Sequence, residues 1–100
     1  MTGSNREGSG AAPHTAHWLV AGRVQGVGFR YFVREAARRH GVHGDVRNLP
    51  DGRVELRAAG GNLGAFLEEV RQGPAASRVD DIESNDLQPA PELEGFEIRF

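Results

Sequence analysis

The stretch GRVQGVGFR, residues 22–30, joins an apolar run to a segment with helical periodicity that begins at about Phe29. A strand that turns through glycines into a helix places several unpaired backbone N–H groups around one small concavity, where the helix dipole adds partial positive charge. Gly26 and Gly28 carry no Cβ atom that would keep a ligand away from this backbone. Arg30 adds a planar guanidinium that can bind a phosphate or a carboxylate bidentately. These features indicate a strand–loop–helix unit with an anion-binding loop.

The loop differs from the common phosphate-binding motifs. It lacks the third glycine of the dinucleotide fingerprint, and it lacks the Lys-Ser/Thr pair of a Walker loop, since the chain contains no lysine. The motif alone is therefore equally compatible with an anion site and with a glycine-rich connection whose arginine is simply solvated.

The rest of the chain alternates between strand and helix patterns. Apolar residues at every second position predict strands, and spacings of three and four predict helices. Val79 and Ile82 lie three positions apart within an expected strand, which predicts a bulge there. The expected elements are a strand at 17–23, a helix at 29–40, strands at 42–49 and 53–59, a helix at 63–72, a strand at 78–87, a polar loop at 89–94 and a short strand at 96–100.

This order, β-α-β-β-α-β with one short extra strand, predicts an α+β ferredoxin-like fold. Two helices cover one face of a mainly antiparallel sheet in that fold, and the first and third strands are central neighbours. The loop at 22–30 and the end of the second strand are then expected at the same edge of the sheet. Because this fold hosts many unrelated functions, it does not by itself define one.

Asn48 is the second polar candidate, at the end of the second expected strand and directly before the turn Pro50-Asp51-Gly52. An asparagine before such a turn is ordinary turn chemistry, and the pattern alone favours that role. The alternative is a carboxamide that holds a water molecule beside the ligand of the anion-binding loop.

Length and composition limit the remaining possibilities. One hundred residues with a net charge of −2 make one small domain without the basic balance of a nucleic-acid-binding or membrane-surface protein. The absence of cysteine excludes disulfides, thiolate catalysis and cysteine-bound metals. His14 and His17 lack further ligands at metal-binding spacing, so we expect no metal site.

The N-terminal residues 1–13 are rich in glycine, serine and alanine and show no apolar periodicity. We expect a disordered tail there and a folded domain at 14–100. No apolar run approaches the roughly 20 residues of a membrane span, and no hydrophobic signal segment begins the chain. These features predict a cytoplasmic protein.

Residues 22–30, followed after one helix by Gly44-x-Val46-x-Asn48-x-x-Asp51-Gly52, resemble the two signature segments of the acylphosphatase family. The resemblance extends over residues 14–100. It implies the ferredoxin-like fold and an acylphosphate phosphohydrolase activity, the hydrolysis of carboxyl-phosphate anhydrides to carboxylate and inorganic phosphate. By resemblance Arg30 and Asn48 are catalytic, and the phosphate-binding loop consists of Gln25, Gly26, Val27, Gly28, Phe29 and Arg30.

The resemblance also implies a mechanism. The loop N–H groups and Arg30 bind the phosphoryl oxygens, and Asn48 orients a water molecule for in-line attack at phosphorus. Because the leaving carboxylate is a good leaving group, we expect no metal and no cofactor. The expected partner is a small-molecule acyl phosphate, with inorganic phosphate or sulfate as product or analogue; we expect a monomer that binds no nucleic acid and no membrane.

One position departs from the family pattern. Asp45 stands where members of the family often carry tryptophan. The position is not catalytic, but its negative charge near the mouth of the site is expected to weaken the binding of an anionic substrate or to change the accepted acyl group.

Three alternatives come from other classes of protein. A ferredoxin-like domain can act as a regulatory or ligand-binding module, although the Arg30 and Asn48 pair argues against this. Acylphosphatase-like domains also begin the carbamoyltransferases of hydrogenase maturation, which continue into cysteine-rich zinc-binding segments, whereas this chain ends at Phe100 without a cysteine. Nucleic-acid binding is disfavoured by the charge balance.

Overall fold

The structure is a computed structural model that describes residues 15–87 and 94–100. The expected tail at 1–13, His14 and nearly all of the expected polar loop at 89–94 lie outside the described residues. The elements are β2 (Thr15–Arg23), α1 (Phe29–His40), β3 (His43–Asn48), β4 (Val54–Ala59), α2 (Leu63–Gln72), β5 (Arg78–Leu87) and β6 (Phe96–Arg99). The predicted order is confirmed, both helices have their predicted bounds, and β5 has its predicted bounds as well. Each of the other strands differs from its expected bounds by one or two residues at one or both ends.

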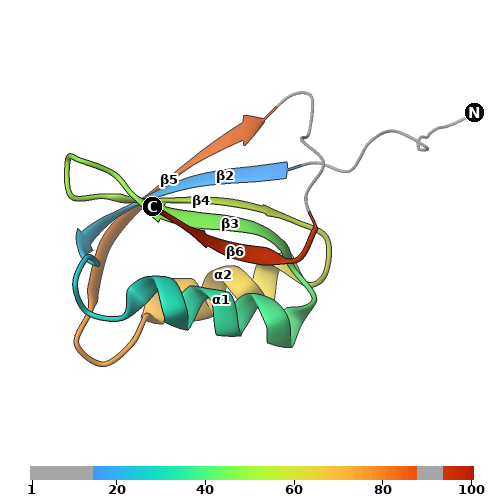
Figure 1. The fold of residues 1–100 in the computed structure, drawn as a ribbon, viewed down its shortest axis with the longest axis horizontal. Coiled ribbons are helices and arrows are strands. Elements are labelled where there is room, and N and C mark those ends of the chain that lie inside the picture. The colour runs from blue at the N-terminus through green and yellow to red at the C-terminus, as the bar shows by residue number, and fades with distance from the viewer. Residues whose placement is uncertain (1–14, 88–93) are drawn as a thin grey trace, which may run out of the picture.

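The five strands form one sheet in the order β5-β2-β4-β3-β6. All neighbours are antiparallel except β3 and β6, which run parallel. Both helices cover the same face of the sheet, and no helix within residues 15–87 and 94–100 lies on the opposite face (Figure 1). The ferredoxin-like α+β fold, with the first and third strands as central neighbours, is therefore confirmed.

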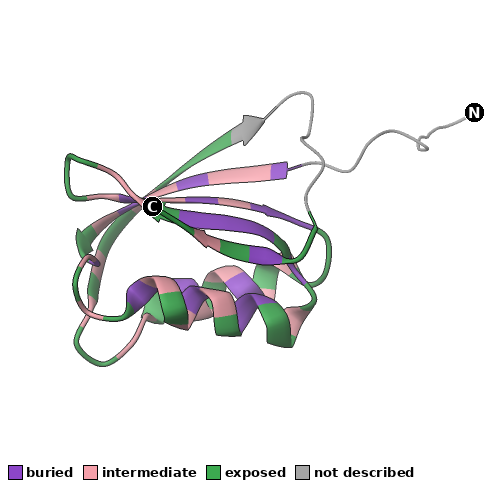
Figure 2. Cartoon of the chain, in the orientation of Figure 1, coloured by how far each residue is buried: buried purple, intermediate pink, exposed green. Residues whose placement is uncertain are grey.

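The core lies between this sheet and the two helices. Alternate strand residues point toward the helices because successive side chains in a strand face opposite sides, and Figure 2 shows the resulting buried bands. The ring of Phe66 on α2 connects the layers, with centroids 6.0 Å from Trp18 and 5.9 Å from Phe96. The buried apolar side chains of α1 are Phe29, Val33, Ala36 and Ala37.

The predicted bulge is present in β5, opposite the end of β2. Ala21 pairs with Asp81 and Gly22 pairs with Val79, so Asp80 is the extra residue. A Cβ atom at Gly22 would lie 2.1 Å from the carbonyl oxygen of Arg78, so only glycine fits this close approach. The bulge lies opposite the residues that directly precede the loop that leads into α1.

Candidate active site

The loop between β2 and α1 uses its glycines for backbone conformation. Gly26 and Gly28 have φ angles of 75° and 78°, in the left-handed region that other residues rarely adopt. A Cβ atom at either position would meet nothing within 4 Å. The space in front of the loop is therefore open to a ligand, and the conformation alone requires glycine.

The loop also presents backbone N–H groups at the start of α1. Gly28 occupies the N-cap position without a side-chain hydrogen bond, and the first turn contains no acidic residue. The first backbone bond of the helix runs from Phe32 N to Gly28 O at 3.1 Å. Within residues 15–87 and 94–100, the N–H groups of residues 26–30 have no hydrogen-bond acceptor. This arrangement suits an anion, because the orphan donors and the positive end of the helix dipole coincide.

Arg30 lies in the first turn of α1 and reaches across to the end of β6. Its Nη1 donates to the carbonyl oxygen of Arg99 at 3.2 Å. Its guanidinium carbon lies 4.9 Å from the centroid of the Phe100 ring, a cation–π distance. The guanidinium is thus held by one hydrogen bond and one aromatic contact, and its other N–H groups remain available to a ligand.

Asn48, the last residue of β3, lies in the same region. The parallel register pairs Arg47 with Arg99, which brings Asn48 beside Phe100. Asn48 and Phe100 line one hollow of about 480 Å³, together with Arg47, Leu49 and Pro50. The Asn48 Oδ1 atom is buried and accepts no hydrogen bond from the described residues. An oxygen atom of this kind is free to accept a hydrogen bond from a water molecule.

Gln25 has a role that the sequence did not indicate. Its Nε2 donates to the carbonyl oxygens of Leu49 at 2.8 Å and Arg53 at 2.9 Å. Both N–H groups of the amide are used, so the side chain ties the loop to the turn between β3 and β4. The structure thereby brings the loop, Arg30 and Asn48 to one edge of the sheet, as the fold predicted. No local sequence pattern predicts these two carbonyl partners, which lie 24 and 28 positions from Gln25 along the chain.

We expect Gln25→Ala to lower the free energy of unfolding by about 1–2 kcal/mol, because two carbonyls each lose one donor. We also expect kcat/KM for an acyl phosphate to fall about tenfold, since the loop is no longer held against the turn that carries Asn48. Urea unfolding followed by Trp18 fluorescence and steady-state kinetics measure the two effects. Gln72→Ala, an exposed glutamine at the end of α2, is the matched control. Unchanged kcat/KM in Gln25→Ala would refute the positioning role.

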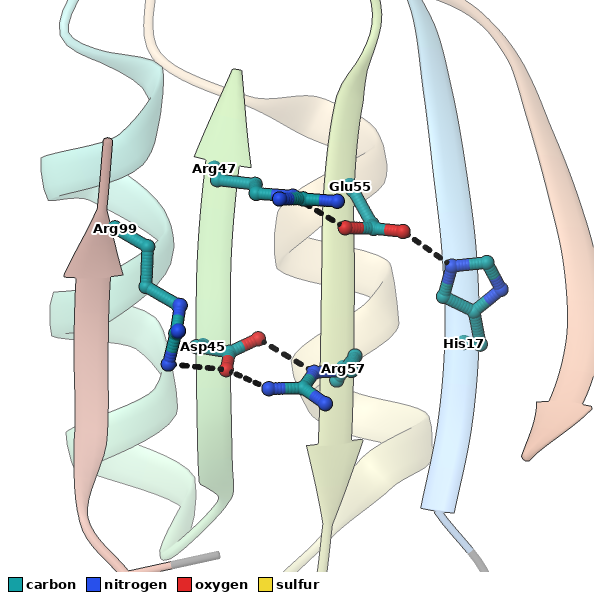
Figure 3. A pocket seen from close by; sticks show the side chains of 6 residues that line it. All are labelled: His17, Asp45, Arg47, Glu55, Arg57 and Arg99. Carbon is teal, nitrogen blue, oxygen red and sulfur yellow. Dashed lines mark hydrogen bonds and ion pairs between the residues drawn. The ribbon is translucent and has the colours of Figure 1, made fainter. Parts of the chain in front are cut away.

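The sheet face away from the helices carries a second polar group of residues, shown in Figure 3. They surround a shallow hollow of about 340 Å³. These residues lie on β2, β3, β4 and β6, where they alternate with core residues along each strand. We call them the outer-face cluster: His17, Asp45, Arg47, Glu55, Arg57 and Arg99.

Asp45 belongs to this cluster, and its carboxylate is paired. Only 6% of the residue is exposed. One oxygen accepts from Arg57 Nε at 3.0 Å, the other accepts from Arg57 Nη2, and Arg99 Nη1 lies 3.6 Å away. The hydrogen bonds to Asp45 raise the pKa of Arg57. The Asp45 carboxylate is therefore balanced by two arginines on the outer face, and the expected effect of its charge on substrate binding stays a prediction.

Glu55 joins His17 and Arg47 in the same cluster. His17 Nε2 lies 2.9 Å from one carboxylate oxygen, and Arg47 Nε donates to the other at 2.7 Å. Partial burial alone would raise the pKa of Glu55, but the hydrogen bonds from His17 and Arg47 outweigh it and lower that pKa from the usual 4.5. His17 thus lies beside a carboxylate, and the described residues contain no group of three or more potential metal-ligating side chains.

The lowered pKa of Glu55 predicts an acid dependence of stability. Its ionised form is favoured in the folded state, so its contribution is complete above 4.5 and is lost as the pH falls through the lowered value. We expect Glu55→Gln to be less stable than the parent at pH 7, with the difference in the free energy of unfolding shrinking toward pH 3. Urea unfolding at both pH values measures it, with the exposed Glu68→Gln as control. A difference independent of pH would contradict the assignment.

The sheet order and the two helices on one face define an α+β ferredoxin-like domain, and the loop between β2 and α1 is its candidate anion-binding site. No helix among the described residues has the length and apolar character needed to cross a membrane. The sequence profile of the acylphosphatase family matches residues 16–98. The chain therefore belongs to the acylphosphatase family, and the protein is an acylphosphate hydrolase.

Individual relatives agree with this assignment. The acylphosphatase of Koribacter versatilis is 50% identical over 86 residues, which cover 84% of this chain and 78% of that protein. The crystal structure of acylphosphatase from Bacillus subtilis superposes with a TM-score of 0.81 at 39% identity, covering 87% of this chain and 99% of that one. Full-length HypF, in its phosphate- and nucleotide-bound form, matches with a TM-score of 0.75 at 26% identity, over 91% of this chain but only 12% of HypF. A domain of this kind thus also occurs inside a much longer protein.

Proposed function

We propose that the protein cleaves acyl phosphates by in-line attack of one water molecule at phosphorus. The loop at 25–30 and Arg30 hold the phosphoryl group, and Asn48 orients the water. The observation that carries this proposal is that the N–H groups of residues 26–30 and the Asn48 Oδ1 atom have no hydrogen-bond partner among the described residues, while the Arg30 guanidinium lies against Phe100, which lines one hollow with Asn48.

The phosphoryl group is the part of the substrate that the loop suits. An acyl phosphate dianion spreads its charge over three phosphoryl oxygens, and backbone donors fixed in advance need no reorganisation when charge shifts in the transition state. Arg30 adds a permanent charge that can bind two of these oxygens together. Its contacts with Arg99 O and the Phe100 ring restrict the guanidinium before substrate arrives.

Water is the nucleophile in this scheme. A water molecule that donates to Asn48 Oδ1 has its lone pairs directed away from the amide, toward phosphorus held in the loop. The water oxygen forms a bond to phosphorus as the bond between phosphorus and the acyl oxygen breaks, and the carboxylate leaves. The products are one carboxylate and one dihydrogen phosphate, so atoms and charge balance. Asn48 contributes mainly by holding the reactants together rather than by removing a proton.

The proton of the attacking water passes to a phosphoryl oxygen of the substrate. The placement of the described histidines supports this route. His17 lies in the outer-face cluster beside Glu55. His40 pairs with Glu69, and His43 accepts a hydrogen bond from Gly95 N at 3.1 Å. His40 ends α1, a helix of 12 residues and about 18 Å, whose other end carries the loop.

Turnover of benzoyl phosphate in the presence of a chelator tests the proposed function, including its independence of metal and cofactor. We expect hydrolysis at undiminished rate after chelation, competitive inhibition by inorganic phosphate, and weaker inhibition by sulfate. Loss of activity on chelation, restored by a divalent metal, would contradict the scheme. Phosphate binding by the folded protein without any turnover would also contradict it, and would favour a phosphate-sensing role. That the protein acts as a monomer, without nucleic-acid or membrane partners, remains a prediction.

A further inference from the structure

We infer that Phe100 and Pro50 form a contact surface for the acyl group of the substrate, so that flat apolar acyl groups are preferred to acetyl. This inference rests on the proposed function, because it takes the loop at 25–30 as the phosphate site. It concerns the half of the substrate that the loop, Arg30 and Asn48 leave unassigned.

The exposure of Phe100 is the first observation. Only two large apolar side chains are strongly exposed among the described residues, Phe100 at 95% and Tyr31 at 57%. Single exposed apolar residues are common on protein surfaces and need no explanation. Phe100, however, lines the same hollow as Leu49 and Pro50, and that hollow also contains Asn48. The exposed ring is therefore part of an apolar wall next to a proposed catalytic residue.

The depth of the hollow gives the direction of the reaction. Asn48 and Phe100 both line it; the Asn48 Oδ1 atom is buried, whereas Phe100 is 95% exposed and so lies at the rim. The guanidinium of Arg30 lies 4.9 Å from the Phe100 ring, so a phosphoryl group on Arg30 lies close to that ring. In-line attack requires the water and the leaving carboxylate on opposite sides of phosphorus. With the water at the buried amide, the acyl group must leave toward the rim.

The rim is suited to an apolar acyl group. A phenyl or branched alkyl group can cover the Phe100 ring and the exposed Pro50, removing apolar surface from water. Acetyl is too small to cover both. The hollow of about 480 Å³ has room for an aromatic ring. Arg47, the charged residue that lines the hollow, directs its Nε to Glu55 on the outer face.

Calorimetric binding of two phosphonates tests this inference independently of turnover. In 2-oxo-2-phenylethylphosphonate and 2-oxopropylphosphonate a methylene group replaces the bridging oxygen, so they mimic benzoyl and acetyl phosphate without being hydrolysed. We expect the phenyl compound to bind about tenfold more tightly to the parent protein. Phe100→Ala should remove most of this preference, because the phenyl compound loses the apolar contact. The methyl compound and inorganic phosphate should lose less affinity than the phenyl compound, and both by the same factor, since they lose only the contact that restricts Arg30. Phe100→Tyr should retain the preference.

Tyr31→Ala is the matched control, because Tyr31 is the other strongly exposed aromatic residue among those described. Its ring also contacts an arginine: the guanidinium carbon of Arg34 lies 5.2 Å from the ring centroid. Tyr31→Ala should leave both affinities unchanged. Equal binding of the two phosphonates to the parent, or an equal loss for both in Phe100→Ala, would overturn the inference; the second result would make Phe100 a support for Arg30 only. Tight phosphonate binding with the expected preference but no hydrolysis of benzoyl phosphate would support the acyl surface and refute the proposed function, so the two failures are distinguishable.

Discussion

Arg30→Ala is expected to reduce kcat/KM for benzoyl phosphate by at least about 10²–10³-fold, the usual loss when one preorganised donor to transition-state charge is removed. The loss should exceed that of a neutral donor, because Arg30 supplies a full charge as well as N–H groups. Its removal should also raise the inhibition constant of inorganic phosphate, since the guanidinium binds the phosphoryl group in the ground state as well as in the transition state. Steady-state kinetics and phosphate inhibition constants measure both effects.

The control for this variant is Arg38→Ala, on the same helix. Arg38 lies two turns further along α1, about 12 Å away, and is exposed beside Glu35. Arg38→Ala removes the same charge from the protein without changing a contact of the loop, so kcat/KM should change less than about twofold. Similar losses in both variants would indicate that general electrostatic attraction, not the position of Arg30, supports activity.

Asn48→Ala is expected to lower kcat about 10²-fold or more while the affinity for inorganic phosphate changes less than about twofold. The reason is that Asn48 acts on the water and not on the phosphoryl group. The variant protein should unfold at nearly the same urea concentration as the parent, because Asn48 Oδ1 accepts no hydrogen bond from the described residues. Single-turnover rates and phosphate inhibition constants separate the two effects.

Asn85→Ala provides the control, since Asn85 is exposed on β5 and its side chain bonds only Glu83 among the described residues. A collapse of phosphate affinity in Asn48→Ala would show that Asn48 binds the phosphoryl group, and the water-orienting role would then be wrong. Normal kcat in that variant would remove Asn48 from the mechanism altogether.

Local sequence patterns were sufficient for most of the fold. The bounds of α1 follow from its apolar spacing together with Gly28 and Gly41, which take left-handed conformations at its two ends. The break between Val79 and Ile82 marked the bulge, because a bulge displaces the alternation by one residue. Strand ends were less certain because the residues there alternate weakly. The topology alone predicts that the loop at 22–30 lies close to the end of the second strand. The hydrogen bonds from Gln25 to the turn after β3 confirm that closeness.

Contacts that depend on register between distant strands were not predictable. Asp45 and Arg57 face each other across β3 and β4, and the sequence gives no reason to pair them before the register is known. The Asp45 carboxylate therefore looked like an added charge near the site, whereas it is part of the outer-face cluster. The contact of Arg30 with Phe100 spans almost the whole domain and depends on the parallel pairing of β3 with β6. Such contacts join residues of different strands and helices, whereas a local sequence pattern describes only one strand or helix at a time.

Isotope labelling tests the central claim most directly. Benzoyl phosphate is hydrolysed in water enriched in ¹⁸O, and both products are examined by mass spectrometry, with a control in which unlabelled products are incubated with the protein in the same water. Attack at phosphorus by the water that Asn48 orients predicts one ¹⁸O atom in inorganic phosphate and none in benzoate. Label in benzoate would mean attack at the carbonyl carbon, and the roles assigned to the loop, Arg30 and Asn48 would then be wrong.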